Sequence, residues 1–443
     1  MLSMREPYEA AIAIAPAGTP VESLHPSARW DLLLVCLATY IATAVGRVHQ
    51  LFPVLAPLKP TLVSAVVAVG LLALQQQGSR NVFSVRSATT TCALGFLLWV
   101  ALSVPGALNE GIAFHLLTDY CLKTIVMFMV IAGAVRSVRD VERLALAYFA
   151  ATALYGTVVL TRFHLGGGDD WRLGHLYDYD ANDFATLIAT AMPLGLYFVL
   201  GVRRPFQRVV ALAGLAILAV CEIRSGSRGG LLALLAVAAF VLLRFTTIPA
   251  RSRVVGLAVV LAIVFGTASD RYWDQMQTVL NPHEDYNVTS ETGRVQIWKR
   301  GLGYMADHPV LGVGAGNFPV AEGTISPMAR RAEYGAGVRW GAAHNSLVQV
   351  GAELGVPGLL LSVGVIVSAL VALRRTARAA LRAGAPDLAV SGLAQSLMAA
   401  LVGFMVGGFF LSLGYSDMLF TLVALAVGLH KVASIDRGAQ WSW

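Results

Sequence analysis

The chain has 443 residues, of which 56% are hydrophobic and only 13% are charged. About a quarter of the residues of a soluble domain are charged, so this composition excludes a water-soluble fold. The formal net charge is +7, and 29 of the 33 basic residues are arginines that stand mostly in short segments between apolar runs. This distribution indicates membrane topology, and no basic, aromatic-rich patch predicts binding of nucleic acid.

The segment 1–28 contains four prolines and scattered charges, but no basic region followed by an apolar core and a cleavage site. We interpret it as a cytoplasmic tail rather than a signal peptide. The four cysteines all fall in or beside apolar stretches, without a CxxC or Cys/His spacing. The sequence therefore predicts neither a disulfide framework nor a zinc site.

Twelve apolar segments are long enough to cross a bilayer, which requires roughly 20 mostly apolar residues. They predict an all-α membrane protein of about twelve transmembrane helices, with spans 1–9 in 29–268 and spans 10–12 in 344–432. A large loop, 269–343, separates spans 9 and 10, and residues 433–443 form a C-terminal tail. The segments lie near 30–47, 54–75, 88–105, 114–135, 141–161, 182–201, 206–223, 228–246, 252–268, 344–372, 386–413 and 417–432.

The arginines predict the orientation of these spans, because short cytoplasmic loops retain Lys and Arg. One set of alternate loops holds fifteen arginines, whereas the opposite set holds only Arg47, Arg162, Arg172, Arg224 and Arg228. Both termini are then cytoplasmic, and the loop 269–343 faces the periplasm. Loops of more than about 15 residues are usually functional, so we expect the chemistry there.

An amphipathic helix is predicted inside this loop. Val295, Trp298, Leu302 and Met305 recur at helical spacing, which indicates a helix on the membrane face or on the bundle of spans. Arg294 and Lys299 belong to the same segment.

His344 stands where the long loop meets the tenth span. An imidazole with an ordinary pKa near 6.5 suits a general base at neutral pH. Asn345, Gln349 and Glu353 follow on successive turns, and an ionisable group such as Glu353 inside a membrane helix is a functional candidate by default. The alternative interpretation is that His344 caps the helix and that Asn345 and Gln349 are interfacial polar residues.

A second candidate is the arginine pair Arg224 and Arg228 in the external turn RSGSRGG. Arg228 precedes a span, where helix N–H groups and a guanidinium together favour a phosphate. The alternative is an arginine that extends toward lipid headgroups.

A third external segment, residues 171–184, contains Arg172 and Asn182 and ends at a span. Its Asp178 and Asp180 form a DxD pattern, which holds a divalent metal in many glycosyltransferases, although a three-residue pattern is weak support. The GVGAGN segment at 312–317 has no βαβ context, so a Rossmann nucleotide site is excluded.

Taken together, these motifs resemble the O-antigen ligase superfamily of bacterial envelope proteins, which includes polysaccharide polymerases and some protein O-glycosylation ligases. The resemblance rests on the SRGG turn at 227–230, on 294–299 with the following HPVLGVGAGNF segment at 308–318, and on His344-Asn345 to Gly358. It implies about twelve spans and an inverting glycosyltransferase in the bacterial inner membrane with its active site toward the periplasm. It also implies a donor glycan on undecaprenyl diphosphate, no metal and no cofactor.

The expected mechanism needs few groups, because a lipid diphosphate is already a good leaving group. Arginines must hold the diphosphate, and a base must free the acceptor hydroxyl. We expect Arg228, Arg294 and His344 to be catalytic. The expected substrate-binding residues are Arg172, Asn182, Arg224, Arg339, Asn345, Gln349 and Glu353.

The acceptor is expected to be a lipid A core sugar, as in a ligase. A polymerase, which extends a growing glycan, is the nearest alternative, and sequence barely separates the two. A lipid-linked glycan transporter is the alternative of another class. Charged residues along a pathway in mid-span would favour a transporter, but the sequence offers only Lys123 and Asp119 there.

Overall fold

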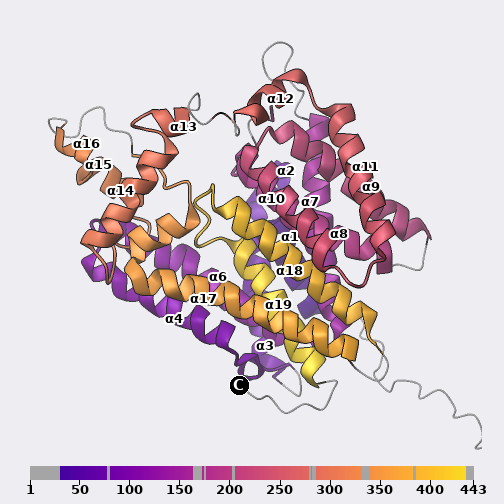
Figure 1. Ribbon diagram of the computed structural model, residues 1–443. Helices are drawn as coiled ribbons and strands as arrows, with labels where there is room; N and C mark the ends of the chain where they lie inside the picture. Colours follow the sequence, from indigo (N-terminus) through magenta and orange to yellow (C-terminus); the bar gives the residue numbers. More distant parts are fainter. Residues whose placement is uncertain are drawn as a thin grey trace, which may run out of the picture.

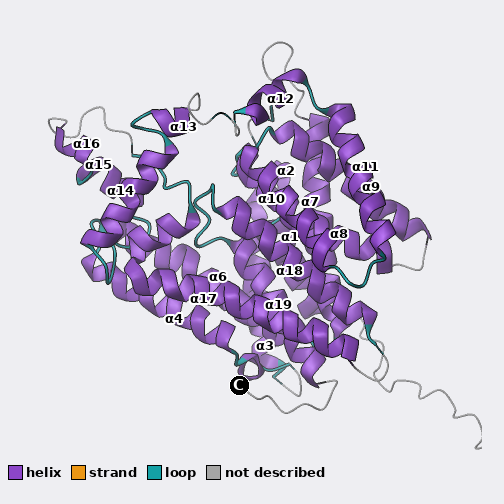
Figure 2. Cartoon of the chain, in the orientation of Figure 1, coloured by secondary structure: helices purple, strands orange, loops and turns teal. Residues whose placement is uncertain are grey.

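The computed structural model describes residues 30–76, 80–162, 172–173, 176–201, 205–278, 281, 286–331, 340–382 and 386–435 (Figure 1). These residues are almost entirely helical, and no β-strand occurs among them (Figure 2). The predicted all-α class is confirmed. The tail 1–28, most of the tail 433–443, and Arg339 lie outside the described residues.

The helices follow one another along the chain in an order close to the predicted one. The first half forms α1 (Leu32–Ala44), α2 (Val48–Leu51), η1 (Pro53–Leu58), α3 (Pro60–Leu74), η2 (Val82–Val85), α4 (Ala88–Ser103), η3 (Val104–Gly106), α5 (Glu110–His115), η4 (Leu116–Cys121), α6 (Leu122–Ala134), α7 (Val138–Arg162) and α8 (Ala181–Gly201). The second half forms α9 (Pro205–Ser225), α10 (Arg228–Arg244), α11 (Ala250–Thr267), α12 (Asp270–Gln277), α13 (Tyr286–Thr289), α14 (Arg294–Asp307), α15 (Phe318–Thr324), α16 (Pro327–Arg331), α17 (Ser346–Arg382), α18 (Leu388–Gly408) and α19 (Asp417–Ile435).

Each of the twelve predicted spans contains a helix, but not every helix has the length of a span. Nine helical segments of the described chain are long and apolar enough to cross a membrane, or ten if the bent pair α11 and α12 is one broken span. Helix α1 has 13 residues, about 20 Å at 1.5 Å per residue, against a hydrocarbon core of about 30 Å. The protein is therefore a multi-pass membrane protein, and twelve spans remain a prediction.

Side-chain caps fix where several helices begin. Ser87 accepts a hydrogen bond from the Thr90 backbone at 3.1 Å, and Ser227 accepts one from the Gly230 backbone at 3.0 Å. Asp387 caps α18 in the same way. Each cap satisfies a backbone donor that would otherwise be unpaired, typically stabilising the helix by about 1 kcal/mol.

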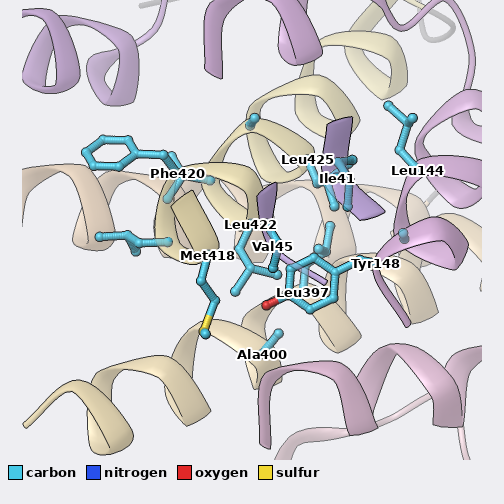
Figure 3. Packing of buried hydrophobic residues seen from close by; sticks show 14 of the residues in the cluster. Ile41, Val45, Leu144, Tyr148, Leu397, Ala400, Met418, Phe420, Leu422 and Leu425 are labelled. Atoms are coloured by element: carbon cyan, nitrogen blue, oxygen red, sulfur yellow. The ribbon is translucent and has the colours of Figure 1, made fainter. Parts of the chain in front are cut away.

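Helices α8, α18 and α19 form the centre of the bundle, because most of their residues are buried. Figure 3 shows side chains from four helices packed together there, among them Ile41 of α1, Tyr148 of α7, Leu397 of α18 and Leu422 of α19. The hydroxyl of Tyr148 forms a 2.7 Å hydrogen bond with Thr190, so this buried polar group is satisfied. The close-packed centre fixes the ends of the helices that carry the polar turns.

Two groups of ion pairs lie at opposite ends of α1. Before the helix, Asp31 pairs with Arg80 at 2.5 Å and with Arg136 at 3.1 Å. After the helix, Arg47 pairs with Asp178 at 3.4 Å. Arg80 and Arg136 thus share one end and Arg47 the other, which is the grouping that the arginine distribution predicts.

The region 269–343 is not an extended loop, because its described residues form α12 to α16. Figure 1 shows these helices along one edge of the molecule, where α14 packs against α17. The predicted amphipathic helix is present as α14. Its buried stripe, Ile297, Gly301 and Tyr304, lies one position before the predicted one, whose Leu302 is 51% exposed. The reason is Gly301, where the missing side chain lets Val348 of α17 and Phe318 of α15 pack against α14.

Candidate active site

The turn between α9 and α10 presents two arginines. Gly226 adopts a left-handed φ of +56°, which glycine adopts without strain, and the turn ends at the Ser227 cap. Arg228 is the first residue of α10, and its guanidinium donates to the hydroxyl of Thr278 at 2.7 Å. Thr278 directly follows α12, so this bond brings the region after α11 over the turn.

Arg172 and Asn182 lie against the same turn. The Arg172 Nε donates to the carbonyl of Ser225 at 2.6 Å, and its terminal nitrogen donates to Asn182 Oδ1 at 2.8 Å. The backbone N–H of Leu173 donates to the carbonyl of Arg224 at 2.8 Å. The structure therefore brings Arg172 and Asn182 together with the Arg224 backbone, which lies more than 40 residues further along the sequence.

Arg294 begins α14, one helical turn before Trp298. The Trp298 indole donates to the carbonyl of Ala343 at 3.1 Å, and its ring lies edge-on to Phe409 with 5.3 Å between centroids. The next residue, Phe410, also contacts Trp298. Trp298, one turn into α14, is thus held between the residue before His344 and the segment after α18.

Residues 409–412, which we call the 409–412 turn, connect these parts. A Cβ atom at Gly229 would lie 3.2 Å from the Cβ of Phe410, so Phe410 packs directly on the start of α10. Ser412 accepts a 2.9 Å hydrogen bond from the backbone N–H of His344. Gly229, Trp298 and the His344 backbone therefore share one neighbour, the 409–412 turn. Gly229 follows Arg228 directly, and Trp298 lies one turn after Arg294.

His344 has a left-handed backbone with φ of +50°. Such a conformation in a residue other than glycine stores about 1–3 kcal/mol, and such residues cluster at functional sites. The cap of α17 is supplied by Asn345, whose side-chain oxygen accepts from the Leu347 and Val348 backbones at 2.9 and 3.0 Å. His344 is half-buried, so its side chain keeps access to solvent.

Gln349 and Glu353 hold the loops on both sides of His344. Gln349 accepts from the Gly414 backbone at 3.2 Å. Glu353 is 1% exposed and accepts from the Tyr415 hydroxyl at 2.6 Å and from the Gly316 backbone at 2.9 Å. Because both side chains accept hydrogen bonds from other parts of the protein, Gln349 and Glu353 position the loops around the site.

Helix α17 is broken at Gly355, which has a left-handed φ of +67°. The break leaves backbone carbonyls of α17 without partners inside the helix, and the GVGAGN segment donates hydrogen bonds to them. The backbone N–H of Val313 donates to the Ala352 carbonyl at 2.9 Å, and that of Gly314 donates to the Glu353 carbonyl at 3.0 Å. A Cβ atom at Gly312 would lie 2.3 Å from the Glu353 backbone. These glycines therefore allow close packing of backbone on backbone, in agreement with the exclusion of a nucleotide site.

Sequence reasoning missed an ion pair between the half-buried Arg300 and the buried Glu322 in the same region. Arg300 of α14 donates to Glu322 of α15, with the shortest distance 2.5 Å, and the Tyr304 hydroxyl donates to the same carboxylate at 2.8 Å. The hydrogen bonds to Glu322 raise the pKa of the Arg300 guanidinium above its ordinary value. The charged Glu322 inside the otherwise apolar segment FPVAEGT was the available signal.

Sequence reasoning also missed two buried charged residues, Glu222 and Lys431, and the half-buried Asp417. Asp417 accepts from Thr124 at 2.6 Å, and Lys431 donates to the carbonyl of Gly133 at 3.0 Å. All three lie near helix ends rather than at mid-span. They therefore do not mark a charged pathway of the kind expected in a transporter.

The DxD aspartates have protein partners. Asp178 contacts Arg47 and Gln50, and Asp180 accepts from the backbones of Asn182 and Asp183 at 2.7 and 2.8 Å, which begins α8. Among the described residues no group of three or more His, Cys, Asp or Glu side chains is arranged to hold a metal ion.

The fold and the site define a multi-pass membrane protein with arginines and a histidine gathered around turns at one end of the helices. Residues 213–363 match the O-antigen ligase family, and no curated protein matches the chain. The match runs from α9 into α17 and includes Arg224, Arg228, Arg294 and His344, but not Arg172 or Asn182. This match, over about a third of the chain, confirms the resemblance to the O-antigen ligase superfamily.

Proposed function

We propose that this protein is an inverting, metal-independent glycosyltransferase that moves a glycan en bloc from undecaprenyl diphosphate to a hydroxyl of the lipid A core. The reaction takes place at the periplasmic face of the inner membrane. The proposal includes twelve spans, cytoplasmic termini and a periplasmic region 269–343. The observation that supports it is that Gly229, Trp298 and the His344 backbone all contact the 409–412 turn. These contacts come from the segments that contain Arg228, Arg294 and His344, and all three segments fall within the residues that match the family.

Each residue has one role in the proposed reaction. Arg228 and Arg294 hold the two phosphates, since a planar guanidinium can donate two parallel hydrogen bonds to phosphate oxygens. The acceptor oxygen attacks the anomeric carbon as its proton passes to His344. The bond from that carbon to the diphosphate breaks, and the lipid diphosphate leaves with the electron pair. Attack opposite the leaving group inverts the anomeric centre.

The other predicted residues support these three. Arg172 and Arg224 add positive charge beside Arg228, and Asn182 orients Arg172 through its 2.8 Å hydrogen bond. Asn345, Gln349 and Glu353 position His344 and the adjoining loops. Arg339, which lies outside the described residues, stays a candidate for the diphosphate site.

The experiment is a transfer assay with full-length protein in nanodiscs and a synthetic lipid-diphosphate oligosaccharide. Lipid A core and free oligosaccharide are offered as competing acceptors. A glycosylated core supports the ligase. Elongated oligosaccharide would make the protein a polymerase, and movement of intact donor across vesicles without a new covalent bond would make it a transporter.

Matched variants separate the site from its surroundings. Arg294→Ala is compared with Lys299→Ala, since Lys299 is exposed and on the same helix. Only the first change should abolish transfer. Equal loss in both variants would mean that α14 contributes through folding and not through Arg294.

A further inference from the structure

A cavity of about 580 Å³ lies between α8, α9, α10 and α11, away from the candidate active site. Its walls are apolar over most of their length, with side chains such as Leu215, Ala238 and Val260. A Cβ atom added at Gly256 of α11 would meet no described atom within 4 Å, so this face of α11 borders open space. The volume falls in the range of sites that bind small ligands, about 300–1,000 Å³.

One end of the cavity is strongly basic. Arg208 of α9 and Arg251 and Arg253 of α11 line it, together with Ser252, and no acidic residue occurs among the described lining residues. All three arginines belong to loops of the arginine-rich set, which the sequence places in the cytoplasm. The Arg228 end of α10 is the opposite one, so this basic end is not part of the active site.

The start of α11 is itself suited to an anion. Its first residue follows Pro249, and no side chain caps the helix, so N–H groups of the first turn have no capping acceptor. Arg253 donates to carbonyls at the end of α10, but its Nε is buried without an acceptor in the described part of the chain. A buried donor left unpaired is unfavourable, and a phosphate oxygen would satisfy it.

The distance along the cavity matches one leaflet. On α9 the lining runs from Arg208 to Ala219, which is about 17 Å at 1.5 Å per residue. Half of a hydrocarbon core of about 30 Å is about 15 Å. A phospholipid with its headgroup at the arginines would therefore place its acyl chains along the apolar walls.

We propose that this cavity binds an anionic glycerophospholipid of the cytoplasmic leaflet. Its phosphate lies at Arg208, Arg251, Ser252 and the Arg253 Nε, and its acyl chains lie between α9 and α11. Basic pockets between membrane helices on the cytoplasmic side recognise such headgroups, and each arginine near the surface strengthens binding about fivefold. The bound lipid would fill the gap between α11 and the rest of the bundle.

The test titrates delipidated full-length protein with dioleoyl phosphatidylglycerol or dioleoyl phosphatidylcholine and counts bound lipid by native mass spectrometry. The first lipid should bind at least fivefold more tightly. Arg208→Gln and Arg251→Gln should each weaken it about fivefold and leave phosphatidylcholine unchanged. Arg244→Gln is the matched control, because Arg244 is exposed in the same region but does not line the cavity.

Two further arms examine the apolar walls and the source of the phosphate. Ala238→Trp fills the cavity and should weaken both lipids while all three arginines remain. Phosphatidylglycerol binding that is equal in the parent, Arg208→Gln and Arg251→Gln proteins would overturn the proposal. So would full competition by inorganic phosphate, which would indicate a simple anion site, or displacement by undecaprenyl phosphate at equal concentration, which would assign the cavity to the donor's chain.

Discussion

Replacing His344 by alanine and by glycine should change activity and stability in different ways. Both substitutions remove the imidazole, so both should lower the transfer rate per folded molecule by about 10² to 10⁴, the usual contribution of a general base. The backbone at this position has φ of +50°. Alanine is strained there by about 1–2 kcal/mol, whereas glycine adopts the conformation freely.

The stability difference can be estimated from this geometry. The backbone hydrogen bond from residue 344 to Ser412 and the Asn345 cap do not involve the imidazole, so both variants keep them. Glycine also gains freedom in the unfolded chain, which offsets part of the relief of strain. We therefore expect the glycine variant to be more stable than the alanine variant by about 1 kcal/mol, and to melt at the higher temperature.

The assay measures turnover with synthetic lipid-diphosphate donor and thermal unfolding in the same detergent. His308→Ala is the matched control, because His308 is exposed in the preceding loop and has no role in the proposed reaction. Rates of both His344 variants within a few-fold of the parent would remove His344 from the mechanism. Equal melting temperatures of the alanine and glycine variants would refute the argument from the left-handed backbone.

Four other predictions follow from the site and the topology. Arg228→Lys should abolish most transfer, because a lysine is a point charge, while Arg244→Lys at the far end of α10 should turn over normally; equal activity would make Arg228 structural. Transfer should persist in a chelator, and rescue by magnesium would instead make Asp178 a metal ligand. Glu322→Ala should destabilise the protein by about 1–3 kcal/mol, because the half-buried Arg300 and the buried Tyr304 hydroxyl lose their acceptor, and an unchanged melting temperature would contradict this. Reporters fused near residue 300 should be periplasmic; a cytoplasmic location would invalidate the proposed function.

The sequence by itself determined the class of the fold and which segment is proposed to carry the chemistry. Apolar runs of about 20 residues have one stable solution in a bilayer, the helix, because every backbone group must be paired within the segment. The twelve runs therefore all became helices, and the arginine counts sorted their loops into two groups. Arg228, Arg294 and His344 could be selected because polar residues beside apolar spans stand out against so uniform a background.

Only the tertiary structure decided how these residues are supported. The sequence gives no reason to connect residues 228, 294 and 344 with the 409–412 turn, since contacts between distant segments depend on packing and not on local pattern. The break at Gly355 and the ion pair of Arg300 and Glu322 depend in the same way on neighbours far along the chain. A neighbour also decided which face of α14 is buried. Gly301 has no side chain that marks it as a buried position, and it belongs to the buried face because Phe318 packs against it.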